Sequence, residues 1–288
     1  MIGTVSALGA ISIWAGWIVA TRYAAQTLDV SIVALLRYAI PALVLMPVWL
    51  RMGLLPRTLS KRVLAALVIG AGTPFFLAAA LGMRFEQAAE VGPLLPGAMP
   101  LFVALLAGVF YREQMSVLRK AGFVLIGAGV AVIIVPHIMT GTLAEASGHA
   151  LVLLSALLWA IYTVALRRTG LSAFEATALI SVWSAITLLP FGIMPLIEAA
   201  KSRTAEIAVQ ALMQGVLSGI VATILFAIAI LRLGPSRAAA FAALLPALVA
   251  ILAIPVLGEI PDALAVVGIV AASFGVAFAS GALERRPA

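Results

Sequence analysis

The sequence has no cysteine and only two histidines among its 288 residues. A chain without cysteine forms no disulfide and offers neither a thiolate nucleophile nor a cysteine metal ligand. It also has no HExxH segment and no paired aspartates, so the usual residue sets for metal-dependent or acid–base catalysis are missing. We therefore expect no enzymatic activity, no catalytic residue, no metal site and no cofactor.

Charged residues are scarce as well. They make up 10% of the chain, whereas soluble domains average about 25%. Hydrophobic residues make up 64%, and the mean hydropathy is +1.21. Such a chain could not cover its surface with polar groups in water, so we expect an integral membrane protein whose partner is the lipid bilayer. The net charge of +7 comes from basic residues in short connections, as in other membrane proteins, and predicts no nucleic-acid partner.

The apolar residues form ten runs that are bounded by charges or turn residues. Their lengths suit transmembrane helices, and the connections are too short to hold a soluble domain. The longest polar break, 136–148, divides the chain into two five-helix repeats, 1–136 and 148–288. The expected fold is thus an all-α membrane protein with ten transmembrane helices around a central cavity. The ten runs are 2–21, 30–50, 62–82, 88–110, 117–136, 148–166, 173–197, 207–231, 236–256 and 262–281.

The basic residues predict the orientation. If both termini lie on one side, that side collects 13 of the 18 lysines and arginines. Because positive loops stay on the cytoplasmic side, we expect a multi-pass protein of a bacterial-type inner (plasma) membrane with both termini cytoplasmic. Residues 1–21 carry no charge, and we interpret them as the first spanning helix instead of a cleaved signal.

The fourth run is interrupted by Pro93, Pro96 and Pro100, together with two glycines. Each proline removes a backbone donor and crowds the preceding turn, so we expect a kinked or broken helix. A broken backbone within a membrane needs protein or a water-filled cavity around it. This segment therefore belongs inside the bundle.

Part of this segment recurs 146 residues later. Pro100 and Glu113 of the first copy correspond to Pro246 and Glu259 of the second, and the register continues through paired glycines. Because each half has an odd number of helices, the two halves enter the membrane with opposite polarity. Interrupted helices at matching places of an inverted repeat indicate the binding site of a transporter.

The first helix of each half carries a pair of aromatic residues. Trp14 and Trp17 correspond to Trp159 and Tyr162, and each pair lies on one helical face. All four fall in the middle third of their helices, away from the interface where tryptophan and tyrosine usually lie. They either fill space between helices or line an aromatic cavity, and their matched recurrence favours the cavity.

Ionisable residues within the expected spans are few. Arg37 lies about seven residues into the second run, and Glu86 and Glu90 lie four apart at the start of the fourth. Arg37 and Glu90 have similar expected depths, and charges at such a depth usually pair or face a cavity. An Arg37–Glu90 pair that locks the bundle is the favoured interpretation, and a role in proton coupling or substrate binding is the alternative. Both histidines, His137 and His149, fall outside the expected core.

These features resemble the EamA-type branch of the drug/metabolite transporter superfamily. The resemblance rests on the ten runs, on Leu36-Arg37-Tyr38 early in the second run, and on Pro100…Glu113 with Pro246…Glu259. The length and the proline-rich fourth run are most similar to YddG-type exporters of aromatic amino acids. The resemblance implies a basket of ten helices around a substrate cavity, with the last helix of each half peripheral. Unlike small multidrug transporters, however, this chain has no acidic residue in its first run, which argues against obligatory proton-for-drug exchange.

We therefore expect a secondary transporter that exports aromatic or hydrophobic amino acids, or related small metabolites, by alternating access. The alternatives are an efflux carrier of other specificity and a passive channel or lipid transporter. The sequence leaves the coupling ion and the oligomeric state open, with a monomer as the working expectation. The expected substrate-binding residues are Trp14, Trp17, Arg37, Tyr38, Glu86, Glu90, Pro93, Pro96, Pro100, Trp159, Tyr162 and Pro246.

Overall fold

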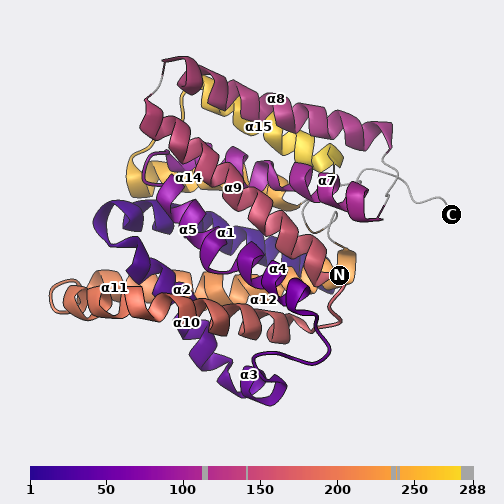
Figure 1. Ribbon diagram of the computed structural model, residues 1–288. Coiled ribbons are helices and arrows are strands. Elements are labelled where there is room, and N and C mark those ends of the chain that lie inside the picture. The colour runs from indigo at the N-terminus through magenta and orange to yellow at the C-terminus, as the bar shows by residue number, and fades with distance from the viewer. Residues whose placement is uncertain (112–115, 141, 235–237, 239–240, 280–288) are drawn as a thin grey trace.

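The computed structural model describes residues 1–111, 116–140, 142–234, 238 and 241–279, and all regular structure in them is helical (Figure 1). Glu113 and the side chain of His137 lie outside the described part. The elements are α1 (Ile2–Thr27), α2 (Val30–Val44), α3 (Met46–Met52), α4 (Lys61–Ala71), α5 (Thr73–Gly82), α6 (Ala88–Gly92), η1 (Pro93–Gly97), α7 (Met99–Tyr111), α8 (Val117–Thr140), α9 (Leu143–Leu166), α10 (Ala173–Ala200), α11 (Thr204–Gln210), η2 (Ala211–Ala222), α12 (Thr223–Leu233), η3 (Phe241–Leu244), α14 (Leu245–Leu257) and α15 (Ala263–Ala279).

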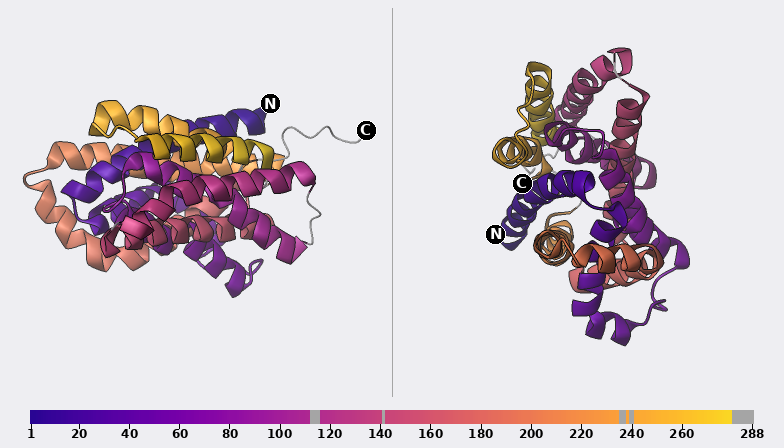
Figure 2. Two further views of the ribbon diagram at one scale, coloured as in Figure 1. Left: turned by 90° about the horizontal axis from the view of Figure 1, so that it is seen from above. Right: turned by 90° about the vertical axis from the view of Figure 1, so that its left-hand side faces the viewer.

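The long helices run roughly along one common direction (Figure 2). Within the described residues six helices are long and apolar enough to cross a membrane, or seven if α2 and α3, bent by 71°, count as one span. Three shorter apolar stretches cover 90–106, 245–257 and 263–279. Helices thus occupy the apolar runs marked by the sequence, and the count of ten spans stays a prediction.

The break expected between the two halves is shorter than the sequence suggested. Helix α8 continues to Thr140, and α9 already begins at Leu143, so the expected polar connection 136–148 is mostly helical. The reason is a capping box: the Thr142 hydroxyl accepts from the Glu145 amide, and the Glu145 carboxylate accepts from the Thr142 amide. His149 lies in the second turn of α9 and is buried, which corrects its expected place outside the core.

Equivalent helices of the two halves have equivalent packing partners. Helix α2 packs on α10, its counterpart in the second half, and α8 packs on its counterpart α15. Helices α4 and α5 pack on α9, just as η2 and α12 pack on α1, and α7 packs on α9 as α14 packs on α1 (Figure 1). The first helix of each half is therefore enclosed mainly by the other half.

Helices α8 and α15 show that the repeats run in opposite directions. A β-carbon on Gly122 would lie 2.4 Å from the Ala279 amide nitrogen, and one on Gly129 would lie 2.9 Å from the Ala272 amide nitrogen. Later residues of α8 thus contact earlier residues of α15, so these two equivalent helices are antiparallel. Small residues let the two backbones approach closely at one side of the bundle, as in other membrane helix pairs.

The proline-rich segment is broken, as the sequence predicts. Helix α6 is followed by the π-helical turn η1 and then by α7, and every residue from 90 to 100 is buried. A β-carbon on Gly92 would lie 2.8 Å from the Pro246 α-carbon. The proline segments of the two halves therefore touch inside the bundle, where protein covers the irregular backbone.

Candidate substrate cavity

A small cavity lies between the first helices of the two halves and both proline segments. It is almost entirely apolar and aromatic. The lining residues are Trp14, Trp17, Ile18, Arg37, Phe75, Leu95, Pro96, Met99, Trp159 and Leu245. Five of the residues expected from the sequence are among them, namely Trp14, Trp17, Arg37, Pro96 and Trp159.

The aromatic side chains form a continuous cluster. The rings of Trp14 and Trp159 meet edge to face, with centroids 5.2 Å apart and planes at 90°. Phe75 joins the two ends of the cluster, at 4.7 Å from the ring of Trp159 and 6.4 Å from that of Trp17. Phe226 lies behind Trp14 at 4.8 Å. Edge-to-face and tilted contacts of this kind stabilise aromatic clusters beyond the area that they bury.

Trp17 is oriented by a buried polar network on η2. Its indole N–H donates to the Gln214 side-chain oxygen at 2.7 Å. The Gln214 amide group in turn donates to the Thr21 hydroxyl and to the Gln210 side-chain oxygen, each at 3.0 Å. Gln214 is fully buried and thereby fixes the position of one wall of the cavity.

Arg37 brings a buried positive charge to the cavity. Its guanidinium lies 4.8 Å from the ring centroid of Trp17, a cation–π distance, and one terminal nitrogen donates to the Ser218 hydroxyl at 2.6 Å. Within the described residues no acidic side chain lies within ion-pair distance of Arg37. The expected Arg37–Glu90 pair is therefore not formed, because α2 packs on α10 and η2 while α6 packs on α14.

Three hydrogen-bond donors on the lining residues are buried without a partner. They are Trp14 Nε1, Trp159 Nε1 and Arg37 Nε. Buried polar groups in native proteins are nearly always satisfied, so unsatisfied ones call for an explanation such as a bound ligand or water. Among the described lining side chains, all the unsatisfied polar atoms are donors, and Arg37 is the one ionisable group. The cavity is therefore suited to a ligand that supplies acceptors.

Two helix starts also line the cavity. Met99 is the first residue of α7 and Leu245 is the first residue of α14. Each follows another helical turn, η1 through Ala98 and η3 directly, so neither start has a full set of free backbone N–H groups.

The other expected proline sites have different positions. Pro93 is buried in η1, and Pro100 and Pro246 are the second residues of α7 and α14. None of the three lines the cavity. At the start of a helix proline fits without loss of a hydrogen bond, so Pro100 and Pro246 begin helices instead of bending them.

The two expected tyrosines lie behind the cavity wall. The Tyr38 hydroxyl lies 2.9 and 2.8 Å from the carbonyl oxygens of Ala71 and Gly72, at the break between α4 and α5. The Tyr162 ring packs against Trp159 at 5.0 Å. The Tyr38 hydroxyl therefore provides a donor for the carbonyl oxygens at the break between α4 and α5. The Tyr162 ring supports the aromatic wall from behind.

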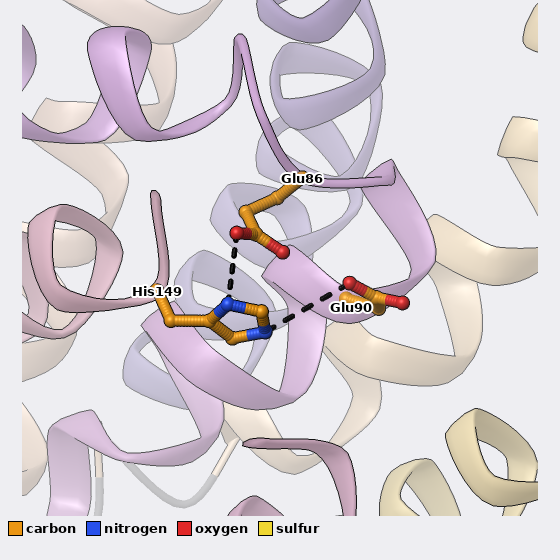
Figure 3. Close-up of side chains that lie close together, drawn as sticks. All are labelled: Glu86, Glu90 and His149. Carbon is orange, nitrogen blue, oxygen red and sulfur yellow. Dashed lines mark ion pairs between the residues drawn. The ribbon is translucent and has the colours of Figure 1, made fainter. Parts of the chain in front are cut away.

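Glu86 and Glu90 lie apart from the cavity, beside His149 (Figure 3). His149 Nδ1 is 2.9 Å from the Glu86 carboxylate, and Nε2 is 4.0 Å from the Glu90 carboxylate. All three side chains are buried. Glu86 precedes α6 and Glu90 lies within it, so the two glutamates do not share a helical face, and the sequence did not indicate the histidine that lies between them.

Several further residues of the site were not expected from the sequence. Gln210, Gln214 and Ser218 recur every four residues along one apolar helix, and this polar stripe on one face could have indicated them. Phe75 and Phe226 gave no such signal, since a phenylalanine in an apolar run is equally suited to lipid contact.

The fold and the cavity define a multi-pass membrane transporter made of two related halves. Residues 1–135 and 146–281 each match the EamA-like transporter family, so the chain belongs to this family of the drug/metabolite transporter superfamily. It is a transporter and not an enzyme. The substrate is not given by the family.

Individual relatives are more distant. The chain is 31% identical over 130 residues to the uncharacterized transporter YcxC of Bacillus subtilis (strain 168), an alignment covering 45% of this chain and 41% of that protein. A solved crystal structure of a protein with 16% identity superposes with a TM-score of 0.67 over 99% of both chains. At that identity the second comparison shows a shared fold alone.

Proposed function

We propose that the protein transports small amphipathic carboxylates, with aromatic or hydrophobic amino acids and related metabolites as the leading substrates. The observation that carries this proposal is the set of three unsatisfied donors on an aromatic wall, with no acidic residue among the described lining side chains. A carboxylate would accept from these donors and offset the charge of Arg37. The rings would accept an aromatic or aliphatic side chain.

The same features argue against other specificities. A cationic drug would meet the charge of Arg37 without a described carboxylate on the wall. A lipid or a passively conducted ion would not explain the aromatic wall with its buried donors. The ammonium group of an amino acid could lie against the tryptophan faces, where cations are attracted to the ring.

We further propose that transport proceeds by alternating access and in the direction of export. The antiparallel packing of α8 on α15 supports two inverted halves that can rock around a fixed site. The distribution of basic residues supports cytoplasmic termini in an inner membrane. Reporters fused after Arg57 and Arg168 should then report the cytoplasm, and a fusion after Lys201 should report the opposite side. An external signal after Arg57 would reverse the orientation.

The substrate proposal can be tested by counterflow in proteoliposomes, which needs no assumption about the energy source. The panel consists of tryptophan, indole-3-propionate, which lacks the amine, and tryptamine, which lacks the carboxylate. We expect tryptophan and indole-3-propionate to exchange and tryptamine to fail. The variant Arg37→Gln should reduce exchange of both carboxylates. Exchange of tryptamine as fast as that of tryptophan would overturn the proposal.

A further inference from the structure

Glu86, Glu90 and His149 form a second buried cluster that the aromatic cavity does not use (Figure 3). The exposed fractions of the three residues are 1%, 8% and 3%. Glu86 precedes α6 and Glu90 lies within it, whereas His149 comes from α9 of the second half. The cluster therefore connects the two halves of the protein through ionisable groups.

The geometry of the cluster suits a proton better than a metal ion. The two carboxylates approach opposite nitrogens of one ring, Glu86 at Nδ1 and Glu90 at Nε2 (Figure 3). One donor atom of each residue lies within 4.8 Å of the others, but an ion bound at Nε2 beside Glu90 would lie across the ring from the Glu86 oxygen that contacts Nδ1. Nδ1 also lies 2.8 Å from the Glu145 carbonyl oxygen, which can only accept, so Nδ1 must carry a hydrogen. That nitrogen is then unavailable as a metal ligand.

The charges of the cluster call for a cation, which a proton on His149 would supply. With a neutral imidazole the cluster holds two negative charges, and with an imidazolium it holds one. Buried charge in a membrane protein is costly unless it is paired. Among the described residues, His149 is the ion-pair partner recorded for Glu86. An imidazolium would share its Nδ1–H between the Glu145 carbonyl and the Glu86 carboxylate and would place its Nε2–H on the side of Glu90, so its charge would offset both carboxylates.

The residues around the cluster pack closely against the Glu86 carboxylate. Its oxygen Oε1 is buried without a hydrogen bond of good geometry. A β-carbon at Gly148 would lie 2.4 Å from the same oxygen and 2.9 Å from the Phe85 β-carbon, so a larger residue here would displace the carboxylate. On the other side, Glu90 and Asp262 line a cavity between α8 and α15 whose other lining residues are apolar.

We propose that Glu86, His149 and Glu90 are a proton-binding site that ties α6 of the first half to α9 of the second. The described charged groups around it are Arg22 and Glu259, which hold the first turn of α6, together with Arg84, Glu145 and Asp262. One proton turns His149 into a bridge between the two glutamates, and its loss leaves two carboxylates facing one neutral ring. This site goes beyond the proposed function and does not depend on which substrate is carried.

Nitrogen-15 NMR of histidine-labelled protein in detergent tests the proposal without any substrate. The full chain gives only two imidazole systems, and His137→Gln assigns the one that belongs to His149. An ordinary imidazole, with a pKa of about 6.5, is mostly neutral at pH 7.5. We expect His149 instead to carry protons on both nitrogens at pH 7.5, and to lose one of them in Glu86→Gln and in Glu90→Gln.

Glu175→Gln is the matched control, because this carboxylate caps α10 away from the cluster and its removal should leave the His149 signals unchanged. A singly protonated His149 at pH 7.5 in the unmodified chain would overturn the proposal, whether or not the glutamine variants fold. Saturable binding of added Zn²⁺ that shifts the His149 signals and disappears in Glu86→Gln would overturn it in favour of a metal site.

Discussion

Arg22 and Glu259 form an ion pair across the two halves, with 3.0 Å between Arg22 Nε and Glu259 Oε1. The same arginine donates to the Met83 carbonyl oxygen at 2.7 Å, and the second carboxylate oxygen of Glu259 accepts from the Ala88 amide at 2.7 Å. This network joins the ends of α1 and α5 to the start of α6 and to the segment after α14. It closes the end of the bundle that lies away from the N-terminus.

Glu259→Gln should loosen this end. A hydrogen bond to a charged group contributes roughly 1.5–3 kcal/mol, so its loss should favour opening by about tenfold or more. The chain has no cysteine, so Met99→Cys places a single thiol in the cavity. We expect Glu259→Gln to raise the rate at which a membrane-impermeant reagent labels this thiol from the Arg22 end.

Arg84→Gln is the control for this experiment, because its side chain is exposed and its carbonyl, not its guanidinium, contacts Arg22. An equal increase in labelling for Arg84→Gln would reduce the effect to one of surface charge. Restoration of slow labelling in the charge-swapped pair Arg22→Glu with Glu259→Arg would support the ion pair as the cause.

Two glycines of α8 allow a matched test of the contact between the halves. A β-carbon at Gly122 would lie 2.4 Å from the Ala279 amide nitrogen, whereas one at Gly127 would meet nothing within 4 Å. Gly122→Ala should therefore lower the free energy of unfolding by about 1–3 kcal/mol, since backbone must move. Gly127→Ala should leave it unchanged or raise it by up to about 1 kcal/mol, because alanine favours helix. Thermal unfolding in detergent separates the two, and an equal loss of stability would contradict the packing.

The aromatic cavity could be predicted from the sequence because its tryptophans recur at equivalent positions of the two halves. Trp14 and Trp159 occupy equivalent places in the two halves, and an inverted repeat brings such places together near the pseudo-axis. The interior position of Pro96 was predictable for a separate reason, since a broken backbone cannot face lipid.

Pairings between particular charges could not be predicted in the same way. Arg37 and Glu90 have similar depths along the chain, but depth does not tell which helices face each other. In the structure Arg37 meets Ser218 on η2, and Glu90 meets His149 on α9. The burial of His149 could not be predicted because it lies at the polar start of the run 148–166, and its carboxylate neighbours come from the other half of the chain.

The prolines should differ in their effect on transport. Pro96 lies inside η1 and lines the cavity, so Pro96→Ala should let the turn become regular helix and change the KM for carboxylates. Pro100 and Pro246 begin helices, where proline costs little, so their alanine variants should keep kinetics close to those of the parent. Counterflow kinetics of the three variants provide the measurement. Equal losses in all three would remove any special role for the π-helical turn.

Gln214→Leu should weaken the wall that Trp17 forms. The change leaves the indole N–H, the Thr21 hydroxyl and the Gln210 oxygen without their common partner. Interhelical hydrogen bonds in membranes contribute about 0.6 kcal/mol on average and up to about 1.7. We expect a lower melting temperature and a non-additive double-mutant cycle with Trp17→Phe. Additive losses would show that Gln214 does not act through Trp17.

Trp14 and Trp159 allow the substrate role of the indole N–H groups to be separated from that of the rings. Both N–H groups are buried without a partner, whereas that of Trp17 is bonded to Gln214. Trp159→Phe keeps a ring and removes an unsatisfied donor, so the empty protein should be as stable as the parent or more so. Trp17→Phe removes a satisfied donor and leaves the Gln214 side-chain oxygen without its hydrogen bond, so this variant should be less stable than the parent.

Transport should be more sensitive to Trp159→Phe than to Trp17→Phe, the opposite of the order expected for stability. If Trp159 donates to the substrate carboxylate, Trp159→Phe should raise the KM for tryptophan by about two- to tenfold, the equivalent of one hydrogen bond of roughly 0.5–1.5 kcal/mol. Trp159→Ala should in addition weaken aromatic substrates more than aliphatic ones, because ring contacts contribute about 0.5–1.5 kcal/mol beyond buried area. A lowered melting temperature in Trp159→Phe, with equal fractional loss for tryptophan and alanine, would show that this ring only packs helices together.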